Sequence, residues 1–294
     1  MIGRLVYGTS RLTGGASERE AQRLLGIVAD AGVTMLDSAP PYGIGTAERS
    51  IGRFLRENDR GRSIAVIAKT GLPRPRLPVL KSGLRAIKRR IVPPRPTTDA
   101  GWQPRKPPDA YGEGSFDPAA LAASFEHSLD LLGRADIVLL HEAGPAELRD
   151  GTLAAIERCA ELADARPGFS WGGFLDEGKA ACFPAYWIAE AGMAPDRLGS
   201  PPAPLPREGI LHSIPKTAGW LAASNAAFAA DYRATIEKLT GIDDATARIA
   251  AAFALAARAV SGARLTFTST DPGRLKSLLA AFALIGREGL DRPS

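Results

Sequence analysis

Four side chains with acid–base chemistry follow three successive apolar runs of the chain. Asp37 and Tyr42 flank two prolines in the stretch LDSAPPYG (36–43), directly after the first of these runs. Lys69 ends the second run and His141 ends the third. Side chains of these four types are among those that proteins use to donate and accept protons. Their chemistry depends on whether the fold brings the three run ends together.

Each of these residues also has a purely structural interpretation when it is taken alone. An Asp before a proline-rich segment often caps a turn, because prolines stop a strand abruptly. Lys69 alone reads as a solvated strand end, and His141 alone as a buried histidine with satisfied hydrogen bonds. The order of acid, phenol, ammonium and imidazole across consecutive runs favours a shared site.

The apolar runs alternate with amphipathic helical patterns in the first half of the chain. Ser17 and Glu20 have the spacing of a capping box, Thr46 is the expected cap of the next helix, and Asp117 precedes a proline at a helix start. We expect strands at 4–8, 33–36, 63–69 and 136–141, and helices at 17–32, 46–55, 117–133 and 146–164. Four such units imply parallel strands with right-handed crossovers.

The second half is less regular. Strands are expected at 209–213 and 264–269, helices at 243–262 and 271–286, the last capped by Asp271. The pattern is poor over 165–208, where 167–170 suits a strand and 176–192 suits a helix broken at Pro184. The proline-rich segment 199–206 is excluded from a central strand.

The best fold is an α/β protein of the (β/α)8 TIM-barrel type, a single domain over 1–294. It carries a long Pro/Arg-rich loop, 72–115, after strand 3 and an irregular sector around strands 5 and 6. A doubly wound open sheet is the second choice, because GTSRLTGG after the first strand lacks the dinucleotide-binding glycine spacing. In a barrel the carboxyl ends of the strands form the catalytic face. Polar residues at those ends are Thr9, Ser10, Asp37, Tyr42, Lys69, His141, Ser170, His212, Ser269 and Thr270.

The composition restricts the class of protein. The chain has 294 residues, 45% of them hydrophobic, and a formal net charge of +5. Dispersed Lys and Arg fit an anionic cofactor better than nucleic acid, although KRRIVPPRP (88–96) is locally basic. Two cysteines, Cys159 and Cys182, offer neither a disulfide framework nor a metal spacing. No signal peptide or membrane span is evident, so a cytoplasmic protein is expected.

Three segments resemble consecutive motifs of one family. DSAPPYGIGTAE (37–48), IAVIAKTG (64–71) and DIVLLHEAGP (136–145) look like signatures of the aldo-keto reductases, in the expected order. The resemblance is close over 4–70 and 116–145 and weaker over 165–206. It implies a divergent bacterial member of the family, with a (β/α)8 barrel and a nicotinamide cofactor.

The resemblance implies a catalytic tetrad, for which physical chemistry gives reasons. Tyr42 would donate a proton to a substrate carbonyl as hydride arrives. The Lys69 ammonium would lower the phenol pKa from about 10 by roughly 1–3 units. Asp37 would hold Lys69 in place, since an unpaired charge in the barrel mouth is costly. His141 would bond the carbonyl oxygen and orient it.

The resemblance also implies a cofactor site at the end of the last strand. FTSTDPGRL (267–275) is similar to the family segment that receives the adenosine phosphates, and its hydroxyls precede a helix N-terminus. Arg274 stands where the family often carries an arginine for the 2′-phosphate, so NADP is expected, with NAD as an alternative. The family often carries a lysine at the position of Thr268, where this chain has threonine. The cofactor-binding residues implied are Thr9, Ser170, His212, Thr268, Ser269, Thr270 and Arg274.

The chain departs from the family where the nicotinamide amide is bound. Trp171 replaces the asparagine that usually follows Ser170, and no suitable glutamine is found over 180–200. His212 stands where an aromatic ring usually packs on the nicotinamide. These departures predict a weaker hold on the nicotinamide ring, or altered chemistry, with the tetrad retained.

Three functions are therefore weighed. The leading one is an NAD(P)H-dependent oxidoreductase that interconverts a carbonyl (aldehyde, ketone or sugar) and an alcohol. The second is a redox-neutral lyase, dehydratase or epimerase on the same barrel, and the third is a non-enzymatic, cofactor-sensing regulatory barrel. The expected partner is a small carbonyl or sugar, with no nucleic acid, membrane or metal, in a monomer or weak homo-oligomer. Loop 72–115 is interpreted as a flap over the substrate, with Trp102, Tyr111 and Trp171 as candidate pocket walls.

Overall fold

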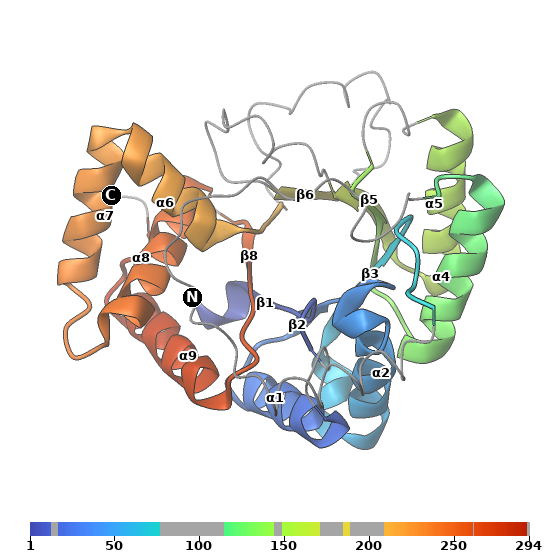
Figure 1. Ribbon diagram of the computed structural model, residues 1–294, viewed down its shortest axis with the longest axis horizontal. Helices are drawn as coiled ribbons and strands as arrows, with labels where there is room; N and C mark the ends of the chain where they lie inside the picture. Colours follow the sequence, from blue (N-terminus) through green and yellow to red (C-terminus); the bar gives the residue numbers. More distant parts are fainter. Residues whose placement is uncertain are drawn as a thin grey trace.

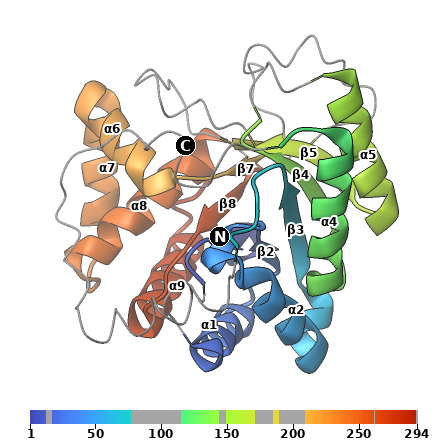
Figure 2. The same ribbon diagram turned by 45° about the vertical axis from the view of Figure 1, so that its right-hand side comes forward.

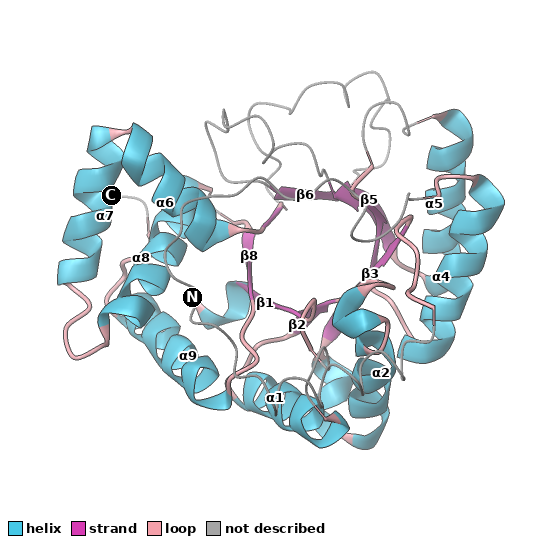
Figure 3. Cartoon of the chain, viewed as in Figure 1, coloured by secondary structure: helices cyan, strands magenta, loops and turns pink. Residues whose placement is uncertain are grey.

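A computed structural model of the chain describes residues 1–12, 17–76, 115–143, 149–170, 185–188, 209–260 and 262–292. Within these ranges the chain forms a ring of strands with helices packed around its outside (Figure 1). The cartoon coloured by secondary structure shows the strands as a closed central ring and the helices as an outer layer (Figure 3). The α/β class and the barrel architecture are thus those expected from the alternation of patterns.

Among the described residues, eight strands follow one another around the ring in chain order, and the ring closes between the first and the last. Their lengths vary from six residues to two, and the shortest, β7, is seen in the turned view (Figure 2). The strands are β1 (Leu5–Gly8), β2 (Met35–Asp37), β3 (Ala65–Thr70), β4 (Ile137–His141), β5 (Arg166–Ser170), β6 (Ala185–Ile188), β7 (Ile210–Leu211) and β8 (Arg264–Phe267).

The inside of the ring is packed by apolar side chains from alternate strand positions. Val6, Met35, Ile67, Ile137, Leu139 and Ile210 form one buried cluster that is separate from the larger core. Successive side chains of a strand point to opposite faces, so the residue two places further along each strand lies on this same inner face. The larger core, which includes Leu36, Val66 and Leu140, lies between the strands and the helices.

The helices pack around the outside of the ring (Figure 1). The described helices are α1 (Glu18–Asp30), α2 (Ala47–Glu57), α4 (Pro118–Leu132), α5 (Asp150–Ala163), α6 (Ile214–Ser224), α7 (Ala226–Glu237), α8 (Asp244–Ala259) and α9 (Pro272–Arg287). None of the helices in these ranges is long and apolar enough to cross a membrane.

Three of the four expected helix caps are present, and the cap expected of Thr46 is not formed by its side chain. Ser17 and Glu20 form the capping box of α1, Asp117 caps α4 and Asp271 caps α9. Thr46 does occupy the N-cap position of α2, but its hydroxyl donates to the Gly43 carbonyl, 2.8 Å away, instead of accepting from the helix. That bond supports the turn before α2.

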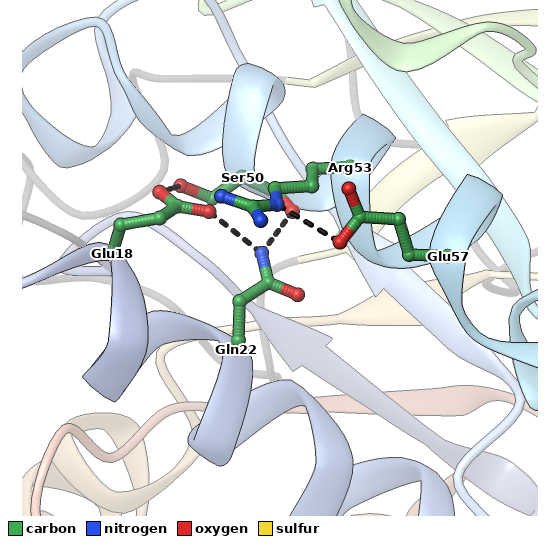
Figure 4. Close-up of polar contacts among 5 residues, drawn as sticks. All are labelled: Glu18, Gln22, Ser50, Arg53 and Glu57. Carbon is green, nitrogen blue, oxygen red and sulfur yellow. Dashed lines mark hydrogen bonds and ion pairs between the residues drawn. The ribbon is translucent and has the colours of Figure 1, made fainter.

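Helices α1 and α2 are joined by polar contacts on their facing sides (Figure 4). The Ser50 hydroxyl donates to the Glu18 carboxylate at 2.5 Å, and the Gln22 amide donates to both Glu18 and the Ser50 carbonyl. Arg53 and Glu57 pair within α2 at 2.9 Å. These contacts fix the helix that follows Tyr42 against the helix that follows β1.

The structure corrects the sequence prediction in the irregular sector. Strand β6 runs antiparallel to both β5 and β7, so the ring is not the uniformly parallel one expected. Residues 185–188 of the expected helix at 176–192 are strand. Helices α6 and α7 were not predicted, whereas the expected strand at 167–170 is confirmed as part of β5. Most of loop 72–115 lies outside the described residues.

Candidate active site

The alternation of inner-face residues places the acid–base side chains at one end of the ring. Asp37 lies two residues beyond Met35 on β2, and Lys69 lies two beyond Ile67 on β3. His141 likewise follows Leu139 on β4. Each of the three therefore caps the inner apolar cluster at the carboxyl end of its strand.

Lys69 lies between the carboxylate and the phenol. Its Nζ is 2.5 Å from Oδ1 of Asp37 and 2.9 Å from the Tyr42 hydroxyl. The ammonium also lies 4.8 Å from the centre of the Tyr42 ring. Lys69 and Asp37 are buried, with exposed side-chain fractions of 0% and 2%. A buried ion pair of this geometry is held together because either charge alone would be expensive to desolvate.

The protonation of Lys69 is fixed by its neighbours. Burial disfavours the ammonium form, but the charge of Asp37 and the contacts with Asp37 and Tyr42 outweigh it, so the pKa of Lys69 is raised above its ordinary value of 10.5. The residue therefore remains a cation beside the phenol throughout the neutral range.

His141 brings an imidazole next to the Tyr42 ring. The ring centres of His141 and Tyr42 are 5.6 Å apart and the planes are nearly perpendicular, at 84°. His141 is buried, with 4% of its surface exposed, while Tyr42 is partly exposed. The structure thus brings together all four side chains of the sequence-predicted tetrad, on β2, the following turn, β3 and β4.

Thr9 and Ser10, at the end of β1, support this arrangement from behind. The buried Thr9 hydroxyl donates to the Asp37 carbonyl at 2.8 Å, and the Thr9 amide donates to the same oxygen at 3.0 Å. The Ser10 carbonyl accepts from the Gly43 amide at 3.1 Å. The cofactor contact expected of Thr9 stays a prediction, while its backbone and hydroxyl hold the strand that carries Asp37.

The expected phosphate site lies at the junction of β8 and α9. Thr268 and Arg274 are exposed, and Thr270 is partly exposed, near the first turn of α9. Ser269 is buried, and its hydroxyl donates to the Asp271 carbonyl at 3.3 Å. The Asp271 carboxylate already accepts from the Arg274 amide at 2.7 Å, which places an anion at the helix N-terminus. An entering phosphate would meet the Arg274 cation and this carboxylate together.

The remaining predicted residues lie further around the ring. His212 directly follows β7, partly buried, with its Nδ1 3.2 Å from the Ser213 hydroxyl. Ser170 ends β5, and its backbone pairs with His141 of β4 and with Tyr186 of β6. The side chain of Ser170, Trp171 and the segment 189–200 lie outside the described residues. Their expected cofactor contacts stay predictions.

Two contributors to the site were missed by the sequence interpretation. Tyr7 is buried on β1 and its hydroxyl donates to the Ser269 carbonyl at 2.7 Å, which ties β1 to the end of β8. Glu48, inside the motif DSAPPYGIGTAE, is buried and pairs with Arg74 at 2.5 Å. An acid at an otherwise buried helix position was the available signal for Glu48, whereas nothing in the sequence distinguished Arg74 from its neighbouring arginines.

The arrangement suits proton transfer at an oxygen atom. Tyr42 is the most exposed residue of the four; its hydroxyl accepts from the Lys69 ammonium, and its ring lies beside the His141 imidazole. The cation favours the phenolate, so a proton can leave the hydroxyl at a lower cost than from a free tyrosine. The imidazole offers a second hydrogen-bonding group for the same oxygen of a substrate.

The chain is similar to known proteins in sequence and in fold. The family model of the aldo/keto reductase family matches residues 4–165. A curated D-threo-aldose 1-dehydrogenase from Pseudomonas sp. is 30% identical over 128 residues, which is 43% of this chain and 35% of that protein, so the match spans about a third of the relative's length.

Two solved structures have a similar fold. An aldo/keto reductase from Klebsiella pneumoniae in complex with NADP and acetate is 16% identical, with a TM-score of 0.53 over 99% of this chain and 92% of that one. An aldo-keto reductase from Bacillus halodurans in its holo form is 14% identical, with a TM-score of 0.51 over 95% and 86%. At these identities the likeness concerns the fold alone. Because the family model covers more than half of its residues, the chain belongs to the aldo/keto reductase family.

Proposed function

We propose that the protein is an NADP(H)-dependent oxidoreductase that interconverts a carbonyl group and an alcohol. The observation that carries the proposal is the Lys69 ammonium, which lies between the Asp37 carboxylate and the Tyr42 hydroxyl beside His141. Membership of the aldo/keto reductase family supports it. We further propose that the whole chain works as one barrel domain of the (β/α)8 type, with 72–115 as a flap over the substrate.

In the reductive direction, Tyr42 donates the proton from its hydroxyl to the carbonyl oxygen. Lys69 stabilises the phenolate that remains, and Asp37 keeps Lys69 in position without being protonated itself. His141 binds the same oxygen and directs it at the phenol. In the oxidative direction the phenolate accepts the alcohol proton, by microscopic reversibility.

The residues at the end of β8 are compatible with a phosphate-bearing cofactor. Arg274 and Thr268 are exposed next to the N-terminus of α9, where a cation and a hydroxyl would bind a phosphate group. When bound, a nicotinamide cofactor supplies or accepts the hydride. We propose that Thr9, Ser170, His212, Thr268, Ser269, Thr270 and Arg274 border it. The Klebsiella structure of similar fold is in complex with NADP, which makes NADP the cofactor we propose.

Aldoses are the first substrates to test. The curated relative's name describes a dehydrogenase of D-threo-aldoses, and its matching 128 residues are 30% identical to this chain. We propose a sugar or small polar carbonyl as the substrate class.

The experiment is a titration followed by a matched activity panel. NADPH and NADH are titrated into the full chain and followed by cofactor fluorescence. Aldehydes and ketones are then assayed with NADPH, and aldoses with NADP⁺. We expect binding and turnover, with Tyr42→Phe retaining NADPH binding but losing roughly 10²–10⁴-fold in kcat. Failure to bind either cofactor would overturn the proposal, as would full activity in Tyr42→Phe.

A redox-neutral reaction is the second candidate. The antiparallel strand β6 lies in the sector where the nicotinamide amide would be bound. This departure from a regular barrel is the observation that favours a reaction in which the nicotinamide undergoes no net redox change. A lyase or epimerase on the same tetrad would turn over substrate with no net change in NADPH. Product analysis with and without added cofactor separates the two functions.

A further inference from the structure

Arg74 connects the end of β3, which carries Lys69, with the turn after β2, which carries Tyr42. It lies five residues beyond Lys69, after β3, and its guanidinium reaches back to the turn that carries Tyr42. One nitrogen donates to the Gly45 carbonyl at 3.3 Å. The other lies 2.5 Å from the Glu48 carboxylate and 3.4 Å from the Ser128 hydroxyl of α4. A single side chain therefore joins the Tyr42 turn, α2, α4 and the end of β3.

The anchor for this guanidinium is a buried acid. Glu48 lies in the first turn of α2 with a side chain that is 0% exposed, whereas the Arg74 side chain is 18% exposed. Among the described residues, the second carboxylate oxygen of Glu48 is buried and makes no hydrogen bond, so the charge of Glu48 depends on Arg74. A buried carboxylate with one cationic partner holds that partner in a fixed position.

The turn that Arg74 contacts needs external support. Gly43, Ile44 and Gly45 all have positive φ angles, of 57°, 60° and 81°. A β-branched residue such as Ile44 rarely adopts this conformation, and such a backbone persists only where its surroundings over-determine it. The Gly45 amide donates to the Tyr42 carbonyl at 2.9 Å, so the residue that Arg74 holds is bonded directly to Tyr42.

We propose that Arg74, anchored by Glu48, is a positioning residue that keeps the Tyr42 hydroxyl against Lys69. The proposal rests on the proposed proton-transfer role of Tyr42. The planar fork of Arg74 serves the Gly45 carbonyl and the Glu48 carboxylate from two different nitrogens, a geometry that the single nitrogen of a lysine does not reproduce. Loss of the contact would let the turn relax and separate the phenol from the ammonium.

The test compares Arg74→Ala with Arg134→Ala, a matched control at the other end of the barrel. Arg134 also donates to backbone carbonyls, those of Gly61, Arg62 and Ile64, but it lies before β4 and away from the tetrad. We expect Arg74→Ala to lower kcat by on the order of tenfold to a hundredfold with the KM for NADPH little changed. Arg134→Ala should lower thermal stability without this loss of kcat.

A second readout does not depend on turnover. Phenolate absorbance is measured as a function of pH for each protein and for the same protein carrying Tyr42→Phe. The difference between the two curves reports the ionisation of Tyr42. We expect the midpoint to move to higher pH in Arg74→Ala, because the phenol loses contact with the Lys69 ammonium, and to remain unchanged in Arg134→Ala. If the wild type is inactive but the Tyr42 midpoint shifts in Arg74→Ala, the proposed function is refuted and the positioning role is supported.

Conservative variants keep the proposal testable if Arg74→Ala does not fold. Arg74→Lys retains the charge beside Glu48, so it should fold and bind NADPH but show part of the kcat loss and part of the midpoint shift. Glu48→Gln should show a smaller loss in the same direction. The proposal is overturned if Arg74→Ala leaves both kcat and the ionisation midpoint of Tyr42 unchanged. If that variant is unfolded, the same result in Arg74→Lys overturns it.

Discussion

At the scale of single residues, the site is organised around one buried cation. Lys69 is fully buried, and its ammonium lies 2.5 Å from Asp37 and 2.9 Å from the Tyr42 hydroxyl. Lys69 and Asp37 could be predicted from the sequence because each lies at the end of an apolar run, and Tyr42 because the motif LDSAPPYG that carries it resembles a family signature. Their dependence on Arg74 could not, since that contact spans segments whose approach is set by the tertiary fold.

The buried ion pair makes a prediction for stability. Lys69→Met leaves the Asp37 carboxylate buried without its cation, which should lower the free energy of unfolding by about 3–5 kcal/mol. The double variant Asp37→Asn/Lys69→Met has no charge left to desolvate and should recover a large part of that loss. Urea unfolding at neutral pH measures all three proteins. A double variant that is less stable than Lys69→Met alone would contradict this account.

Tyr7 makes a prediction for alkaline pH. Burial raises the pKa of Tyr7, and its hydroxyl donates to the Ser269 carbonyl at 2.7 Å. In the unfolded chain the Tyr7 phenol has a pKa of about 10, while the folded chain retains the proton at that pH. The unfolded state therefore binds fewer protons above that pH, and stability falls as pH rises through the folded pKa, by up to about 1.4 kcal/mol per pH unit.

The matched variant for this effect is Tyr7→Phe, which keeps the ring and removes the ionising group. It should cost about 1 kcal/mol at pH 8, for the lost hydrogen bond. The difference in unfolding free energy between wild type and Tyr7→Phe should become smaller between pH 9.5 and 11. Unfolding free energies from urea titrations across this range provide the check, because all other ionising groups are shared. A deficit that stays constant with pH would contradict the sign argued here.

At the scale of elements, helix caps were legible in the sequence because they are local. Asp117 accepts from the amides of Ala119 and Ala120 at 3.0 and 3.1 Å, as its place before Pro118 indicated. Strand direction is not local. The period-two pattern of a short strand is the same in both directions, so the antiparallel run of β6 could not be read from its residues.

The cap of α4 should matter to the site as well as to the helix. Asp117→Ala is expected to lower the free energy of unfolding by about 1 kcal/mol, and Asp117→Asn by less, because asparagine also caps well. Helix α4 contacts the end of β3 through the Thr70 hydroxyl, which donates to the Leu121 carbonyl at 2.9 Å. Chemical denaturation gives the stability change, and equal losses in both variants would indicate that capping is not the cause.

At the scale of the whole molecule, predictability follows the way each sector is built. The first four βα units could be predicted because each carries a strand pattern followed by an amphipathic helix, and two of these helices, α1 and α4, also begin with a capping residue. In the sector from β5 to β7, strands were expected at 167–170 and 209–213 and are found, but β6 was expected as part of a helix, and its antiparallel pairing with both neighbours was not predicted. Helices α6 and α7 follow β7 with low amphipathic contrast, because most of their residues are alanine or partly exposed.

Cofactor binding should stabilise the barrel as a unit, because β8 and α9 pair or pack with β1, α1 and α8. At a concentration 100 times its dissociation constant, NADPH should add about 2.7 kcal/mol to the free energy of unfolding, seen as a rise in Tm. At equal concentrations NADH should raise Tm less, because it lacks the phosphate that Arg274 is proposed to bind.

Arg274→Ala is the variant that tests this selectivity. It should reduce the Tm shift caused by NADPH to that caused by NADH, while the Tm of the protein without cofactor changes little, since the side chain is exposed. The neighbouring Asp271→Asn removes the carboxylate at the same helix N-terminus and keeps the cap, so it should increase the NADPH shift by relieving charge repulsion. An NADPH shift that Arg274→Ala leaves intact would place the 2′-phosphate elsewhere on the barrel, whereas opposite effects of the two variants would locate it at the first turn of α9.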